Sequence, residues 1–302
     1  MGGAEVVARP RAEASPGAGA ARRRGLGPGA AGKALVYLVL IPASALFLFP
    51  IAWSLSTSLK GTEQTFADPP VWIPSPIAWE NYPRGWTLLN FTRFLVNTLV
   101  ISGLSLVGTI LSSSIVAFGF ARLRARGRNL LFALALATLM IPSQATIVPT
   151  FILFYQLGWL DTILPLTVPS FFAADAFFVF LLRQFMLTIT TEIDDAARID
   201  GCGGLGIYWY IVMPLLKPAL AAVAIFSFVS NWNDFFGPLI FLRAYEHATL
   251  ALGLRFLQMN PRNVDLEGTL AVSLLVLVPE IVVFFFAQKQ FIQGITLTGV
   301  KG

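Results

Sequence analysis

Six long apolar stretches alternate with polar connections along the chain. Each stretch is about 18–26 residues long, which is enough for a helix to cross a hydrocarbon core of about 30 Å. A helix is favoured because it satisfies its own backbone hydrogen bonds, as lipid requires. The pattern therefore predicts an all-α integral membrane protein with six transmembrane helices, over residues 35–55, 95–120, 130–154, 163–182, 219–242 and 270–287.

Polar residues interrupt two of these stretches. Gln144 follows Pro142 in the third, and Trp232, Asn233 and Asp234 stand together in the fifth. Polar groups inside a span usually face the bundle interior or an aqueous path. Amide, carboxylate and aromatic groups together suit a sugar, so Trp232, Asn233, Asp234 and Gln144 are candidate substrate-pathway residues. A polar clamp between helices is the alternative explanation.

The composition excludes an ordinary cytosolic enzyme, and the residue types give no support to a membrane-embedded one. Of the 302 residues, 56% are hydrophobic and 12% are charged, whereas soluble domains carry about 25% charged residues. One Cys (Cys202) and one His (His247) cannot form a disulfide, a metal site or a His-dependent catalytic triad. Two further acids within the predicted spans, Asp175 and Glu280, are expected to be structural. We expect no catalytic residue, no metal and no cofactor on this chain.

The basic residues predict the orientation. Residues 1–33 are rich in Gly, Ala, Pro and Arg, which indicates a disordered basic cytoplasmic tail before a membrane domain at 34–302. Fifteen of the 21 Lys and Arg residues fall on the side of this tail. The positive-inside rule therefore places both termini in the cytoplasm, so the basic charge does not indicate nucleic acid. The arginines at 122–128 are expected to lie at the lipid headgroups.

The connection at 185–217 is predicted to contain two short helices. Thr191 suits a helix N-cap, and the spacing of Asp194 and Arg198 predicts an i,i+4 ion pair. Gly201 suits a helix stop. A second apolar helical pattern at 205–212 is expected to end at Pro214. Such helices are too short to span a membrane, and a connector packed on its own bundle would suffice to explain them.

A motif in this connection resembles the signature loop of ABC importer permeases, E-A-A-x3-G-x9-I-x-L-P. The matching residues are Asp195, Ala196, Ala197, Gly201, Ile211, Met213 and Pro214, with Asp for Glu and Met for Leu as the departures. W-N-D at 232–234 and the ending G-I-T-L-T-G-V-K-G at 294–302 resemble the smaller six-helix permease of maltose-type carbohydrate importers. The resemblance covers about 34–302.

The resemblance implies a permease subunit of a binding-protein-dependent ABC importer, which moves a carbohydrate inward by ATP-driven alternating access. It implies that the 185–217 connection is a coupling loop between helices 4 and 5 that docks on a cytoplasmic ATPase dimer, where ATP and Mg would bind. Further implied partners are a second permease, an extracytoplasmic binding protein and lipid of a bacterial or archaeal plasma membrane. The implied coupling residues are Glu192, Asp195, Ala196, Ala197, Gly201, Ile211 and Pro214.

Two alternatives differ from this interpretation. An ion-coupled secondary transporter would account for the intramembrane acids but not for the two-helix connection, and such carriers often have repeated halves. An ABC permease for a polyol such as glycerol phosphate would share the same loop.

Overall fold

The computed structural model describes residues 30–259 and 265–299 of the chain, with side chains for 33–259 and 265–286. The tail predicted at 1–33 therefore lies almost entirely outside the described residues, as do the last three residues of the C-terminal motif, 300–302. The chain divides into two compact units, 1–50 and 51–302. The described part of the first unit is helix α1 up to Pro50, whose apolar side chains are exposed, as suits a lipid-facing segment.

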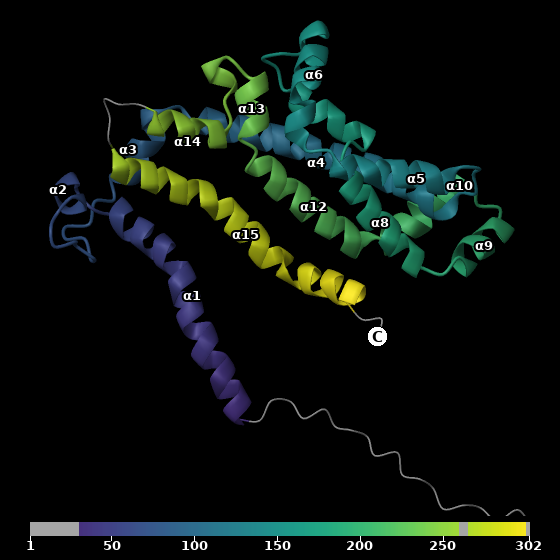
Figure 1. The fold of residues 1–302 in the computed structure, drawn as a ribbon, viewed down its shortest axis with the longest axis horizontal. Helices are drawn as coiled ribbons and strands as arrows, with labels where there is room; N and C mark the ends of the chain where they lie inside the picture. The colour runs from purple at the N-terminus through teal and green to yellow at the C-terminus, as the bar shows by residue number, and fades with distance from the viewer. Residues whose placement is uncertain (1–29, 260–264, 300–302) are drawn as a thin grey trace, which may run out of the picture. The chain divides into compact units, whose positions relative to one another are not determined.

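The described residues are helical and contain no strand, as predicted (Figure 1). The helices in chain order are α1 (Ala30–Ser58), α2 (Thr62–Thr65), α3 (Asn81–Leu88), α4 (Phe91–Arg122), α5 (Arg128–Ala137), η1 (Thr138–Met140), α6 (Ser143–Gln156), α7 (Leu164–Thr167), η2 (Val168–Phe172), α8 (Ala176–Thr188), α9 (Glu192–Ile199), α10 (Gly204–Gly206), the π-helical turn η3 (Ile207–Val212), α11 (Met213–Leu215), α12 (Lys217–Trp232), α13 (Phe236–Phe241), η4 (Tyr245–His247), α14 (Leu250–Gln258) and α15 (Leu266–Gly299).

Helix α4 is the central helix of the second unit. It packs against α8, α12 and η2, while α15 packs against α12 and α3. Two apolar clusters form at its two ends. Phe91 and Phe94 join Trp232 at the first end, and Phe118 joins Leu182 and other residues of α8 and α12 at the second.

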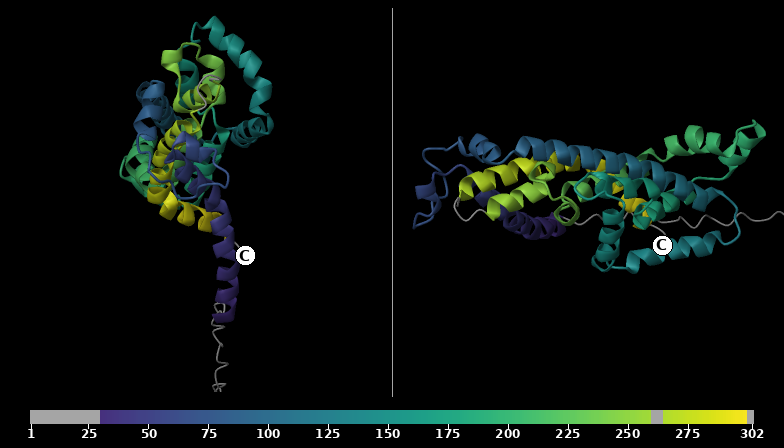
Figure 2. Two further views of the ribbon diagram at one scale, coloured as in Figure 1. Left: turned by 90° about the vertical axis from the view of Figure 1, so that its left-hand side faces the viewer. Right: turned by 90° about the horizontal axis from the view of Figure 1, so that it is seen from above.

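Among the described residues, four helical segments are long and apolar enough to cross a membrane, and the number rises to six if each of two bent pairs is one span. The structure thus supports a multi-pass helical bundle of four to six spans. The predicted single stretch at 130–154 is in fact a bent pair, with 100° between Arg128–Met140 and Ser143–Gln156 (Figure 2). The bend occurs at Pro142, which is extended (ψ 132°) and lacks the N–H that would continue the helix.

Two other predicted stretches are also interrupted. The stretch at 163–182 breaks before α8, where Ala173 adopts a left-handed conformation with φ of 51°. The stretch at 219–242 stops at Trp232 and resumes at Phe236. In each case an aspartate accepts a hydrogen bond from the N–H of the second residue of the helix that follows, so the side chain competes with continued helix formation.

Candidate functional site

The 185–217 connection folds into two helical parts joined at a glycine. Helix α9 spans Glu192–Ile199. Gly201 lies two residues beyond its end, has φ of +83° and donates its N–H to the Arg198 carbonyl at 3.0 Å. A left-handed residue after a helix is most often glycine, because a side chain there would clash with the backbone. The second part runs continuously from α10 through η3 to α11. The predicted helix stop at Gly201 is therefore confirmed.

The start of α9 differs in detail from the prediction. Thr191 occupies the N-cap position, but its side chain caps nothing. The Glu192 N–H instead donates to the hydroxyl of Thr190 at 3.3 Å. The predicted pair between Asp194 and Arg198 is wrong.

Asp194 turns away from solvent to meet the end of α4. Its Oδ2 lies 3.0 Å from Nε of Arg122, and both side chains are only 3% exposed. Arg122 Nη2 also donates to the Ile189 carbonyl at 2.9 Å. Arg198 pairs instead with Asp195 at the surface, at 2.8 Å. Arg122 is therefore a buried partner of the connection and not a headgroup anchor.

A second tether joins the π-helical turn to the same face of α4. The Tyr208 hydroxyl lies 2.7 Å from Ser114 Oγ, and its ring lies 5.4 Å from that of Phe118. Ser114, Phe118 and Arg122 recur at intervals of four residues, so they share one face of α4. That spacing is the sequence signal that could have identified Arg122 as buried.

The π-helical turn also changes which residues of the second part are buried. Ile207, Tyr208 and Val212 are at most 1% exposed, whereas Leu205 and Trp209 of the predicted apolar face are 75% and 49% exposed. Because a π-helix has i→i+5 hydrogen bonds, the side chains that are buried differ from those that ordinary α-helical spacing predicts. The helix ends close to the predicted stop at Pro214. Helix α11 has its last residue at Leu215, one residue after Pro214, and the chain then bends by 77° into α12.

The residues of the predicted coupling motif divide into two groups. Ala197 is buried and Ile211 is half-buried against the α4–α8–α12 core, so they fix the connection to the bundle. The others are exposed, namely Glu192, Asp195, Ala196, Gly201 and Pro214. Large apolar or aromatic side chains beside them are also exposed, and the most exposed are Ile199 at 88%, Leu205 at 75% and Tyr210 at 82%.

The candidate pathway residues lie in separate environments. The Trp232 side chain is 2% exposed, and its Nε1 donates to the Val276 carbonyl at 3.2 Å, so it is part of the packed core. Asp234 Oδ1 accepts from the Gly237 N–H at 3.0 Å, while Asn233 is exposed. Gln144 is exposed in the first turn of α6, a different segment. Their role in transport stays a prediction.

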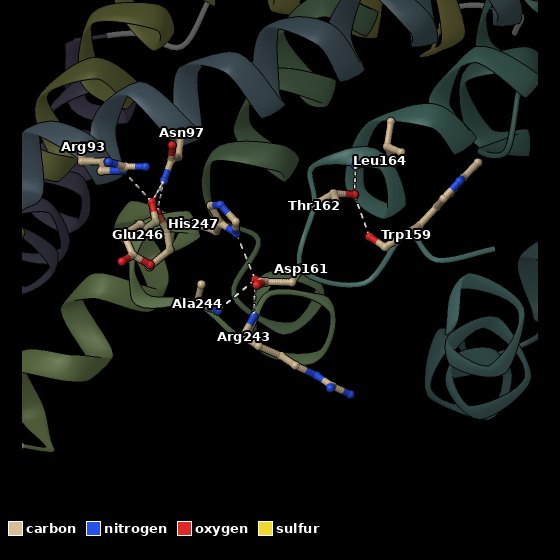
Figure 3. A network of polar contacts seen from close by, with 11 residues as sticks. Arg93, Asn97, Trp159, Asp161, Thr162, Leu164, Arg243, Ala244, Glu246 and His247 are labelled. Atoms are coloured by element: carbon tan, nitrogen blue, oxygen red, sulfur yellow. Dashed lines mark hydrogen bonds and ion pairs between the residues drawn. The ribbon is translucent and has the colours of Figure 1, made fainter. Parts of the chain in front are cut away.

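A polar network joins two loops near the other end of α4 (Figure 3). Asp161 Oδ1 accepts from the N–H groups of Arg243 and Ala244, at 2.9 and 2.8 Å, and lies 3.0 Å from Nδ1 of His247. These contacts lower the pKa of Asp161 from its ordinary value to about 2, with the Ala244 bond as the largest cause. His247 thus has a structural partner that the sequence did not reveal.

Helix α4 is tied to the same loop. Arg93 Nε and Asn97 Nδ2 donate to the Glu246 carbonyl at 3.0 and 2.8 Å. From Arg93 to Arg122 is about 44 Å along a helix. The Asp161 network and the 185–217 connection therefore lie at opposite ends of a helix longer than a hydrocarbon core of about 30 Å.

Comparison with known proteins shows which family and which relatives this chain is similar to. Residues 109–296 match the family model described as "Binding-protein-dependent transport system inner membrane component". The arabinooligosaccharides transport system permease protein AraQ of Bacillus subtilis is 34% identical, over 88% of this chain and 94% of that protein. The sn-glycerol-3-phosphate transport system permease protein UgpE of Yersinia pestis is 32% identical, over 86% and 94%.

Solved structures agree with this comparison. A bacterial ABC transporter involved in the import of the acidic polysaccharide alginate contains a chain that matches with a TM-score of 0.77 and 25% identity, over 85% of this chain and 95% of that one. A second alginate transporter structure, in complex with a periplasmic protein bound to an alginate pentasaccharide, matches with a TM-score of 0.62 at 17% identity, which supports the fold alone.

Proposed function

The chain belongs to the family of binding-protein-dependent transport system inner membrane components, and we propose that it is the permease subunit of an importer that moves a carbohydrate into the cytoplasm. In this role the chain forms part of a pore that alternates between inward-facing and outward-facing states. ATP hydrolysis then occurs on a separate ATPase, which holds ATP and Mg.

The buried Arg122–Asp194 pair is the observation that best supports coupling to an ATPase. A surface loop that only connects two helices has no need of a desolvated ion pair, which is costly to bury unless both partners are present. Here the pair and the Ser114–Tyr208 contact fix the 185–217 connection to α4, so force applied to the connection would reach the span.

The exposed tip of the connection supplies the docking surface in this proposal. Glu192, Asp195, Ala196 and Gly201 stand beside the exposed apolar side chain of Ile199. Small residues permit close approach, and exposed apolar groups grouped at one end suit a protein partner. We expect an ATPase dimer to cover this tip, with Pro214 on the adjoining turn.

Orientation follows from the same assignment. If the 185–217 connection meets an ATPase, both termini lie in the cytoplasm, in agreement with the positive-inside rule. The Asp161 network then lies outside, where a substrate-binding protein would dock. Both partners must bind one state of the pore better than the other in order to drive the cycle. A second permease would complete the pore, and membrane lipid would cover the remaining apolar surface.

A carbohydrate is the proposed substrate because relatives are named for arabinooligosaccharide and, in Streptomyces coelicolor, diacetylchitobiose uptake, the latter at 26% identity. The glycerol-3-phosphate permease at 32% identity makes a polyol phosphate the second candidate. An ion-coupled carrier would need neither an ATPase nor a docking loop.

Purification of the tagged chain from its native host tests the proposal. We expect an ATPase, a second permease and a binding protein to accompany it. The reconstituted complex should import at least one of arabino-oligosaccharide, diacetylchitobiose or sn-glycerol 3-phosphate, in an ATP-dependent manner. Uptake driven by an ion gradient without ATP would refute the proposal, as would a chain that purifies without an ATPase.

A further inference from the structure

A polar cavity of about 170 Å³ lies between η2, α8 and the central helices α4 and α12, apart from the residues at 232–234. Its lining is rich in hydroxyl and amide groups, which is unusual among the apolar side chains of a span. These groups belong to Thr109, Ser113, Ser170, Ser227, Ser230 and Asn231, and Asp175 adds a carboxylate.

The cavity lies at the middle of the bundle. Thr109 is about 24 Å along α4 from Arg93 and about 20 Å from Arg122. Asp175 stands near the middle of the candidate span Leu164–Thr188. The cavity is thus roughly equidistant from the Asp161 network and the 185–217 connection.

The broken backbone at 168–175 builds one wall of the cavity. Ser112 Oγ donates to the Ser170 carbonyl at 2.7 Å, which fixes η2 against α4. Gly108 permits this close approach, because a Cβ there would lie 2.7 Å from the ring of Phe171. Asp175 then caps α8 by accepting from the Phe177 N–H at 2.9 Å. The cavity is therefore a built feature, held by specific contacts.

The inner part of the cavity holds an unsatisfied polar group. Ser113 is 1% exposed, and among the residues that the structure describes its Oγ has no hydrogen-bond partner. Thr109 and Ser227 are also buried, at 7% and 1%. Buried polar atoms in proteins normally have a partner, which at a polar cavity of this size is water or a ligand.

The mouth of the cavity is polar as well. Ser230 and Asp175 are exposed at the surface of the chain. A carboxylate in the middle of a span is costly against lipid, so such residues face protein or a water-filled path. The mouth therefore opens toward water or toward a partner chain.

We propose that this cavity opens into the translocation path and binds the hydroxyl groups of a neutral saccharide in transit. The inference rests on the proposed function and names a site for it. Ser, Thr and Asn side chains both donate and accept, as sugar hydroxyls do. The carboxylate of Asp175 at the mouth accepts hydrogen bonds from a neutral sugar and repels an anionic solute such as sn-glycerol 3-phosphate.

Thiol accessibility tests whether the mouth meets water. In a Cys202→Ser background, Ser230→Cys is compared with Val107→Cys in the reconstituted full transporter, using a cationic, membrane-impermeant methanethiosulfonate reagent. Val107 is half exposed but precedes Thr109 by two residues, so it lies on the opposite side of α4. We expect Ser230→Cys to react at least about tenfold faster than Val107→Cys in at least one of two states, the nucleotide-free or the ATP-arrested state. Modification of Ser230→Cys should abolish most uptake.

Ser170→Cys, on the other wall of the cavity, replaces Ser230→Cys if that variant does not assemble. Equal reaction rates at the cavity position and at Val107, or full modification with unchanged uptake, would overturn the inference.

Selectivity tests the ligand. Asn is as good an N-cap as Asp, so Asp175→Asn removes only the charge, and we expect the ratio of sn-glycerol 3-phosphate to arabino-oligosaccharide uptake to rise. Thr109→Val should lower saccharide uptake about fivefold, since one hydrogen bond is lost. If the wild type imports a probe and neither Asp175→Asn nor Thr109→Val changes its uptake, the inference is refuted and the proposed function stands. If the wild type imports no probe, the proposed function fails, and the thiol rates still decide whether the mouth faces water.

Discussion

The guanidinium of Arg122 and the carboxylate of Asp194 form a desolvated ion pair, 3.0 Å apart, that joins the end of the central helix to the first helix of the 185–217 connection. Helix α9 lies beyond the end of α4 in the fold (Figure 1). The pair is thus a mechanical link between the proposed docking surface and the membrane span.

Removal of one partner of this pair should destabilise the protein. Arg122→Met leaves the Asp194 carboxylate buried without a cation, which costs about 3–5 kcal/mol. We expect a lower thermal midpoint of the purified transporter, and recovery when Asp194→Leu is added. Arg198→Met is the matched control, because the exposed Arg198–Asp195 pair contributes at most about 1 kcal/mol. An unchanged midpoint for Arg122→Met would contradict this role.

Substitutions of Gly201 separate backbone conformation from docking. Its φ of +83° strains most side chains, but nothing lies within 4 Å of a Cβ placed there. Asn and Asp both tolerate this conformation, so Gly201→Asn should keep most uptake. Gly201→Asp differs from Gly201→Asn only by its charge, and it should lose uptake while the protein stays in the membrane. Gly203→Ala, at an ordinary φ of −74°, should behave as wild type. Normal uptake by Gly201→Asp would count against docking at this point.

The Asp161 network should depend on pH in a defined window. Hydrogen bonds from Ala244, Arg243 and His247 lower the pKa of Asp161 to about 2, from about 3.8. A lowered folded-state pKa means that the stabilisation is complete above pH 4 and is lost as the pH falls toward 2. Hydrogen exchange at the Arg243 and Ala244 amides, corrected for intrinsic rates, should stay slow at pH 5 and accelerate below pH 4.

Asp161→Ala should accelerate the same exchange at pH 7. His247→Ala should have a smaller effect, because both backbone hydrogen bonds remain. Equal exchange in wild type and Asp161→Ala would show that the network does not hold the loops together.

The single cysteine reports the orientation of the chain. Cys202 lies in the 185–217 connection and is half-buried. If this connection is cytoplasmic, a membrane-impermeant maleimide added to intact cells should not label Cys202, whereas permeabilised cells should be labelled. Denaturation in detergent supplies the positive control for a reactive thiol. Labelling in intact cells would reverse the assigned topology.

Asp234 distinguishes a pathway role from a structural one. Its Oδ1 accepts from the Gly237 N–H at the start of α13. Asp234→Asn keeps this acceptor and should assemble with its partners but alter uptake, whereas Asp234→Ala should lose the cap, at a cost of about 1 kcal/mol. If Asp234→Asn fails to assemble, or assembles and transports normally, the pathway role is withdrawn.

Local patterns in the sequence determined much of the fold. Hydrophobic length predicted a helical membrane protein, because a span must be apolar over its whole length. Thr191 and Gly201 predicted the boundaries of α9, since helix ends depend on neighbouring residues. The motif around Asp195 and Gly201 indicated the family that the comparisons identified.

Tertiary structure decided which polar residues meet. Two arginines could pair with Asp194, namely Arg198 on its own helix and Arg122 on α4. Only the packing of α9 against α4 selects Arg122, the buried partner. The sequence likewise shows serines on α4 and α12 but not that the break before Asp175 brings them around one cavity. Helical spacing fixes which residues share a face, whereas the partner of that face depends on contacts between segments far apart in the sequence.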